Sequence, residues 1–156
     1  MKSLLFAILL LLLGFLAWPY TAIYRLDHAL QANDRQTIER MIDIHAIRQQ
    51  IKRKMNKEVE SSIGEVSSGF VEWLQQGIQR LGSDAIERLV TTDWVVEQLR
   101  AHNPDPTAGG LLGALDYAFF DSPRSLLLRL GELDDHPVHA RLTLEGTQWR
   151  ITAIYN

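Results

Sequence analysis

Residues 138–154 read VHARLTLEGTQWRITAI, and apolar and polar side chains alternate along this stretch. Every second side chain of its first half lies on one apolar face, formed by Val138, Ala140, Leu142 and Leu144. Glu145 and Gly146 predict a tight turn, after which the alternation resumes, with Trp149, Ile151 and Ala153 opposed to Arg150, Thr152 and Ile154. A period of two is typical of a strand that buries one face, so the stretch predicts a β-hairpin.

Two more alternating runs precede this hairpin. The nearer run has one face formed by Leu126, Leu128 and Leu130, and it follows a turn at Asp121-Ser122-Pro123. The farther run alternates Leu115, Tyr117 and Phe119 with Ala114, Asp116 and Ala118. Runs joined by short turns pair as antiparallel strands, so we expect a C-terminal antiparallel sheet of three or four strands.

Upstream of residue 110 the apolar side chains recur every three or four residues, which indicates helices. Helical segments are predicted, in chain order, over residues 24–32, 35–42, 44–59, 70–81, 85–90 and 92–99, with a bend or interruption at 61–69 and a loop at 102–110. Strands with one apolar face need helices over that face, so the fold class is α+β, with a helical layer packed on the sheet. Three tryptophans are assigned to its core: Trp73, Trp94 and Trp149.

The N-terminal stretch is the most apolar part of the chain, because residues 3–24 carry no charge. About 20 helical residues span the ~30 Å hydrocarbon layer of a bilayer. The strictly apolar residues 4–17 are too few, so a span has to continue through Ile23. We therefore expect a transmembrane anchor over residues 1–24, followed by one soluble domain over residues 25–156.

Aromatic residues mark the end of this stretch. Trp18, Tyr20 and Tyr24 stand where side chains at a membrane interface are common. Pro19 lies among them and predicts either a kink or the start of a new helix.

A cleaved signal peptide is the alternative to an anchor. Cleavage needs small residues at positions −3 and −1, but Ala17 is preceded by Phe15 and Ala22 by Tyr20. The chain has no cysteine for lipoprotein processing. The poor cleavage sites favour an uncleaved anchor.

The charges around the anchor give opposing signals about orientation. The short N-terminus with Lys2 favours export of the domain, whereas Arg25, Arg35 and Arg40 favour a cytoplasmic domain by the positive-inside rule. We adopt export as the expectation.

The overall composition excludes several classes of protein. The 156 residues are 46% hydrophobic and 22% charged with a net charge of −3, which is too apolar for disorder and not basic enough for general nucleic-acid binding. Without cysteine there is no disulfide, thiol nucleophile or cysteine metal site. No nucleic-acid partner is expected.

Candidate catalytic and metal-binding residues have simpler interpretations. His136 and His139, with Asp134 and Asp135, have the composition of a zinc site, but a solvated loop is the favoured interpretation because residues three apart on a strand face opposite ways. The carboxylates of Asp27, Asp34 and Asp43 imitate an acid–base pair, yet Asp34 and Asp43 stand where helix caps belong, as does Thr91 or Thr92. No serine elbow or phosphate loop is present. No catalytic, cofactor-binding or metal-binding residue is assigned, and no cofactor is expected.

The strongest charge feature is a basic stretch without acids, formed by Arg48, Lys52, Arg53, Lys54 and Lys57. A solvated outer helix face is the ordinary explanation. The functional alternative is contact with anionic lipid headgroups or with a partner, favoured by the nearby anchor. A second basic set, formed by Arg129, Arg141 and Arg150, shares one sheet face and either keeps it soluble or meets an acidic partner.

The order of several short motifs resembles a known family. They are Trp18-Pro19-Tyr20, Leu26, Ala29-Leu30, Asp34, Ile42-Asp43-Ile44, Ile47-Arg48, Leu89-Val90-Thr91, Leu142-Thr143-Leu144, Gly146, Trp149-Arg150-Ile151 and Ile154. This resembles domain of unknown function 2939, a family of short bacterial proteins with one membrane anchor. Asp93 departs from the family's proline-acid pattern, and Asn156 ends the chain without its Leu-Pro tail. The resemblance implies lineage and no activity.

A looser similarity connects the helices and the Trp149-x-Ile151-x-x-Ile154 strand to nuclear-transport-factor-2-like domains, which include both pocket enzymes and adaptors. We therefore expect a non-enzymatic single-pass protein of the bacterial inner membrane that presents a periplasmic α+β interaction domain to a protein partner. The alternative is a domain that binds or transforms a small ligand between helices and sheet. A filled core favours the first function, and a pocket with converging His, Asp or Arg side chains favours the second.

Overall fold

The computed structural model describes residues 2–60, 69–102, 110–132, 134 and 136–155. The expected bend at 61–69 and loop at 102–110 lie almost entirely outside these residues. The elements are, in chain order, α1 (Lys2–Ala32), α2 (Arg35–Met41), α3 (Ile44–Glu60), α4 (Gly69–Leu81), η1 (Gly82–Asp84), α5 (Ala85–Leu89), α6 (Thr92–Arg100), α7 (Gly110–Ala114), β1 (Leu115–Ser122), β2 (Ser125–Leu130), β3 (Val138–Glu145) and β4 (Gln148–Tyr155).

The four strands form one antiparallel meander in the order β1-β2-β3-β4. The turn between β3 and β4 is tight, with Gly146 at a φ of +61° that glycine adopts without strain. The far edge of β4 is covered by the connection between α2 and α3, where the Asp43 amide donates to the Ile151 carbonyl at 2.9 Å. The predicted α+β fold class, with helices followed by a C-terminal antiparallel sheet, is confirmed.

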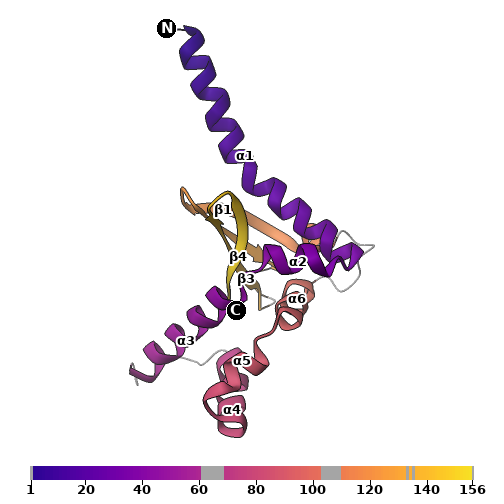
Figure 1. The fold of residues 1–156 in the computed structure, drawn as a ribbon, viewed down its shortest axis with the longest axis vertical. Helices are drawn as coiled ribbons and strands as arrows, with labels where there is room; N and C mark the ends of the chain where they lie inside the picture. The colour runs from indigo at the N-terminus through magenta and orange to yellow at the C-terminus, as the bar shows by residue number, and fades with distance from the viewer. Residues whose placement is uncertain (1, 61–68, 103–109, 133, 135, 156) are drawn as a thin grey trace.

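The core lies between the helices and one face of the sheet. Its fully buried side chains come from both layers: Ile23, Leu26, Ile47, Val90, Val95, Leu99, Leu126, Leu128, Leu130, Leu142 and Ile151. Figure 1 shows α1 and α2 passing over the sheet, with α6 beside them and α3 leaving its lower end. Trp149 belongs to this core and Trp94 packs against it, whereas Trp73 is 38% exposed and stacks on Trp94.

Two irregular positions in the sheet overturn parts of the predicted face assignment. A register shift between Leu115 and Tyr117 places Ala118 and Phe120 against the core, so Tyr117 and Phe119 lie on the outer face. A second shift on β3–β4 buries Ile154 to 3% exposure, although the alternation set it among polar residues. An extra residue in one strand reverses the faces of every residue after it, and simple alternation cannot reveal it.

Helix α1 continues through Pro19 without ending, so the expected start of a new helix there is wrong. Burial changes at the same residue. Side chains before it are exposed apart from the half-buried Phe15, and from it onward one side of the helix is buried: Pro19, Ala22, Ile23, Leu26, Asp27, Ala29 and Leu30. The first half of α1 therefore projects from the domain, and the second half belongs to its core (Figure 1).

Candidate membrane-facing site

The projecting half of α1 is a helical segment whose apolar side chains are exposed. Its exposed large side chains are Leu4, Leu5, Phe6, Ile8, Leu9, Leu10, Leu11, Leu12, Leu13 and Leu16. Within the described residues, α1 alone is long and apolar enough to cross a membrane, by length and composition, with a mean hydropathy of 2.2 over its best window. An exposed apolar surface of this size is typical of a site that contacts a membrane or another protein.

The burial pattern shortens the part of α1 that a bilayer can surround. Ile23 was expected to complete the span, but it is 1% exposed in the domain core. Residues 3–18 remain, and they extend roughly 24 Å at ~1.5 Å per residue, against ~30 Å of hydrocarbon. A membrane that surrounds this segment therefore reaches Trp18, which brings the surface of the domain against the headgroups.

A cleft lies at the base of the projecting half, between α1, α2 and the turn from β3 to β4. Its volume is about 120 Å³. It is lined by Trp18, Thr21, Ala22, Arg25, Thr37, Arg40, Met41, Thr147, Gln148 and Trp149. Two of these side chains are cationic and none is acidic, so the cleft is a positively charged recess beside the point where α1 leaves the domain.

The polar groups of the cleft differ in their partners. Arg25 has no hydrogen bond or ion pair within the described residues, whereas the Arg40 Nε donates to the Gln36 carbonyl at 3.3 Å. The Thr21 hydroxyl donates to the Trp18 carbonyl at 2.7 Å. The indole N–H of Trp149 is buried and has no acceptor in the described part of the chain.

Sequence reasoning missed this cleft. Arg25 and Arg40 contributed only to the charge count for the membrane orientation of α1. They lie on different helices and become neighbours only in the fold. One signal was available: Trp18 and Arg25 are seven residues apart, which places them on one helix face directly after the apolar run.

The predicted basic stretch lies on α3, and its members have different roles. Arg48 is half-buried and caps the end of α5, since its Nε donates to the Val90 carbonyl at 2.9 Å and its guanidinium also donates to the Glu87 carbonyl at 2.7 Å. Lys52 forms an exposed ion pair with the Glu87 carboxylate at 3.5 Å.

The other members of the stretch differ in their exposure. Arg53 is exposed, Lys54 is half-buried and has a partner, and the side chain of Lys57 lies outside the described residues. In Figure 1, α3 begins at the end of the sheet away from the projecting half of α1, with the sheet between them. The basic stretch therefore does not lie beside the point where α1 leaves the domain.

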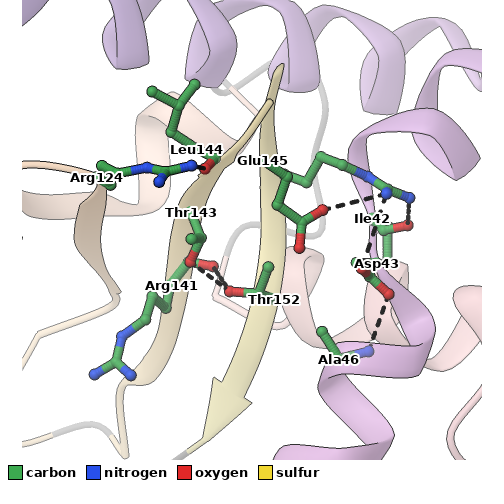
Figure 2. A network of polar contacts seen from close by, with 10 residues as sticks. Ile42, Asp43, Ala46, Arg124, Arg141, Thr143, Leu144, Glu145 and Thr152 are labelled. Atoms are coloured by element: carbon green, nitrogen blue, oxygen red, sulfur yellow. Dashed lines mark hydrogen bonds and ion pairs between the residues drawn. The ribbon is translucent and has the colours of Figure 1, made fainter. Parts of the chain in front are cut away.

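The three sheet arginines are paired with acids of the same chain. Arg129 binds Asp116, Arg141 lies 3.3 Å from Asp121, and Arg150 lies 3.2 Å from Glu145 and 3.8 Å from Asp43. Arg150 also donates to the Ile42 carbonyl at 3.1 Å. Figure 2 shows Ile42, Asp43 and Glu145 gathered where β4 meets α3. Because internal carboxylates neutralise these cations, the sheet face has little net charge to offer an acidic partner.

The predicted helix caps are confirmed. Asp34 accepts from the Thr37 amide at 3.2 Å, and Asp43 accepts from the Ala46 amide at 2.9 Å. The hydrogen bond from the Thr37 hydroxyl is the main cause that lowers the pKa of Asp34. Thr91 caps α6 through the Trp94 amide at 3.2 Å. These carboxylates act in helix capping and do not converge on a common site.

Asp27 has a structural role that the sequence did not predict. It is 3% exposed, and its carboxylate accepts from the Gln31 amide at 2.7 Å and from the Leu112 backbone N–H at 3.3 Å at the start of α7. Gly110 approaches so closely that an added Cβ would lie 2.4 Å from the Asp27 Oδ1, and its φ is +56°. Asp27 therefore attaches α7 to α1.

The histidines considered as metal ligands lie apart. His139 stacks on Tyr155 on the outer sheet face at a centroid distance of 5.6 Å. His136 lies in the turn before β3, where its carbonyl interacts with His102 Nε2 at 3.1 Å. Asp135 lies outside the described residues, and within those residues no group of three or more His, Asp or Glu side chains is placed to hold a metal ion.

A family model described as "Protein of unknown function (DUF2939)" matches residues 8–98, which is more than half of the chain. The chain belongs to the DUF2939 family. The match runs from the projecting half of α1 into α6, so it includes both helices that line the cleft, while the sheet lies beyond it. No curated protein and no solved structure matches the chain significantly.

Proposed function

We propose that this DUF2939 member is a single-pass protein of the bacterial inner membrane that holds a non-enzymatic interaction domain at the periplasmic membrane surface. One observation carries the proposal: α1 is a single helix whose exposed apolar half continues directly into the domain core. No linker separates anchor from domain, so the domain moves with its anchor. This suits a protein that presents a fixed surface to a partner beside the membrane.

The structure of α1 supports an anchor over a cleaved signal. Both small residues at which cleavage was considered, Ala17 and Ala22, lie inside the uninterrupted helix. Ala22 is 8% exposed, so cleavage after it would remove core residues from the domain. Lys2, ahead of the apolar half of α1, favours export of the domain, whereas Arg25, Arg35 and Arg40 after it favour the opposite orientation.

The interior of the domain supports a binding role over catalysis. Apolar side chains fill the space between helices and sheet, and several of them are fully buried, among them Leu26, Ile47, Leu99, Leu128 and Ile151. The ionisable side chains at helix ends and on the sheet take part in caps and internal ion pairs. A partner surface on the outside is therefore favoured over a reaction site inside.

Membrane extraction and labelling test the anchor. We expect the full chain to stay in the membrane pellet after alkaline carbonate extraction and a chain beginning at Trp18 to be soluble. A cysteine in place of Thr147 should react with a membrane-impermeant maleimide from the periplasmic side. Release of the full chain would contradict anchoring, and labelling only after membrane rupture would contradict export.

A further inference from the structure

We propose that the cleft between α1, α2 and the β3–β4 turn binds the phosphodiester group of one anionic phospholipid beside the anchor. This inference rests on the proposed membrane anchoring by α1. Its basis is the juxtaposition of two arginines in a recess without acids, at the level where the apolar half of α1 ends.

The charges of the cleft call for an anion. Arg25 and Arg40 line the same recess, and no carboxylate forms part of its wall, although Asp34 outside the wall interacts electrostatically with Arg40. Two guanidinium groups that share a recess repel each other, and a phosphate between them replaces that repulsion with charge-assisted hydrogen bonds. The three sheet arginines Arg129, Arg141 and Arg150, by contrast, are each paired with a carboxylate of the same chain.

The remaining groups suit a phosphodiester. Thr147 and Gln148 add a hydroxyl and an amide from the turn. Trp149 adds its ring to the same wall, while its indole N–H is buried. At about 120 Å³ the cleft admits a phosphate group but not a whole lipid, so the acyl chains would lie along the projecting half of α1.

The position of the cleft selects a lipid over a dissolved phosphate. Trp18 forms part of its wall and also ends the exposed apolar segment of α1. Tryptophan prefers the headgroup level of a bilayer, which is where lipid phosphates lie. The cleft therefore faces a high local concentration of phosphodiesters whenever α1 is in a membrane.

Lipid retention by the full chain tests the proposal. The protein is reconstituted in nanodiscs of mixed phosphatidylcholine and phosphatidylglycerol, and the lipids that remain bound after release are counted by native mass spectrometry. We expect one retained phosphatidylglycerol per chain. The double variant Arg25→Gln/Arg40→Gln should weaken this preference about 25-fold, at roughly fivefold per arginine. Arg25→Lys/Arg40→Lys, which keeps the charge without the planar fork, should lose less.

A matched control carries the same change of charge elsewhere. Arg53→Gln/Arg88→Gln removes two exposed arginines of α3 and α5 and should leave the lipid preference unchanged. An equal loss in this control, or no preference in the unmodified protein, would overturn the proposal. Displacement of the lipid by millimolar inorganic phosphate would assign the recess to free phosphate instead. All variants should stay membrane-bound after carbonate extraction, so failure of the lipid site is distinct from failure of the anchor.

Discussion

Among single residues, Arg48 shows how a charge pattern can conceal a structural role. Its guanidinium donates to the Val90 and Glu87 carbonyls at the end of α5, and Val90 is fully buried. Arg48→Gln should lower the free energy of unfolding by about 1–3 kcal/mol, because a buried carbonyl loses a charged donor. The exposed neighbour Arg53 gives the control, and Arg53→Gln should change it by less than about 0.5 kcal/mol. Chemical denaturation of both variants measures the difference, and equal effects would contradict the capping role.

His139 gives the domain a predicted dependence on pH. Burial, and secondly the positive charge of Arg129, lower the pKa of His139 below its ordinary value of 6.5. The unfolded chain therefore takes up a proton at His139 before the folded chain does, so this contribution to stability is present above pH 6.5 and declines as the pH falls below it. His139→Gln should lose less stability than the unmodified protein between about pH 7.5 and pH 5.5. Thermal unfolding at both pH values measures this, and identical losses would exclude His139 as the cause.

Helix caps could be predicted from the sequence, whereas side-chain contacts between distant elements could not. Capping by Asp34, Asp43 and Thr91 was predictable because a cap depends on neighbours within three residues. The pairing of Arg25 with Arg40 in one cleft was not, because it depends on how α1 crosses α2. Side-chain contacts between distant elements need the fold itself.

Among the elements, α1 carries the most direct test of domain organisation. The division into residues 1–24 and 25–156 remains a prediction, but Ile23 is 1% exposed and Ala22 8% exposed in the core. A chain beginning at Trp18 should fold and unfold cooperatively. A chain beginning at Arg25 should be several kcal/mol less stable, because loss of one buried isoleucine side chain alone costs about 2–5 kcal/mol. Circular dichroism with thermal unfolding compares the two chains.

A substitution pair within the chain beginning at Trp18 refines this comparison. In the chain beginning at Trp18, Ile23→Ala should lower the free energy of unfolding by about 2–5 kcal/mol. The next residue, Tyr24, is 55% exposed, so Tyr24→Ala should change it far less. Similar effects at both positions would mean that this half of α1 is not packed in the core.

The elements themselves were predictable where a periodic pattern is long and uninterrupted. A sheet of three or four strands and most of the helices were anticipated from periods of two and 3.6, since each pattern reports which side of an element is buried, whereas the short helix α7 was not. The faces of β1 and the end of β4 were not, because one extra residue reverses the alternation and leaves no mark in composition. Pro19 was expected either to kink a helix or to start a new one, and α1 continues through it.

At the scale of the whole molecule, the proposed anchor and the domain share one continuous helix, α1. The exposed half of α1 and the cleft lined by Trp18 and Thr147 face the same boundary, where apolar surface gives way to charged surface. Because the apolar segment spans only roughly 24 Å, the proposed anchoring would hold the domain against the membrane surface. Proteins tethered by a flexible linker lack this constraint.

The depth of two labelled residues in a bilayer tests whether α1 enters the membrane and holds the domain at its surface. The chain has no cysteine, so Leu10→Cys and Thr147→Cys each give one site for a spin label. In reconstituted vesicles, we expect the label at residue 10 to be accessible to oxygen and shielded from a water-soluble nickel complex, and the label at residue 147 to lie at headgroup depth. A label at residue 147 that is as accessible to nickel as one in bulk water, or a mature chain that lacks residue 10, would contradict the account.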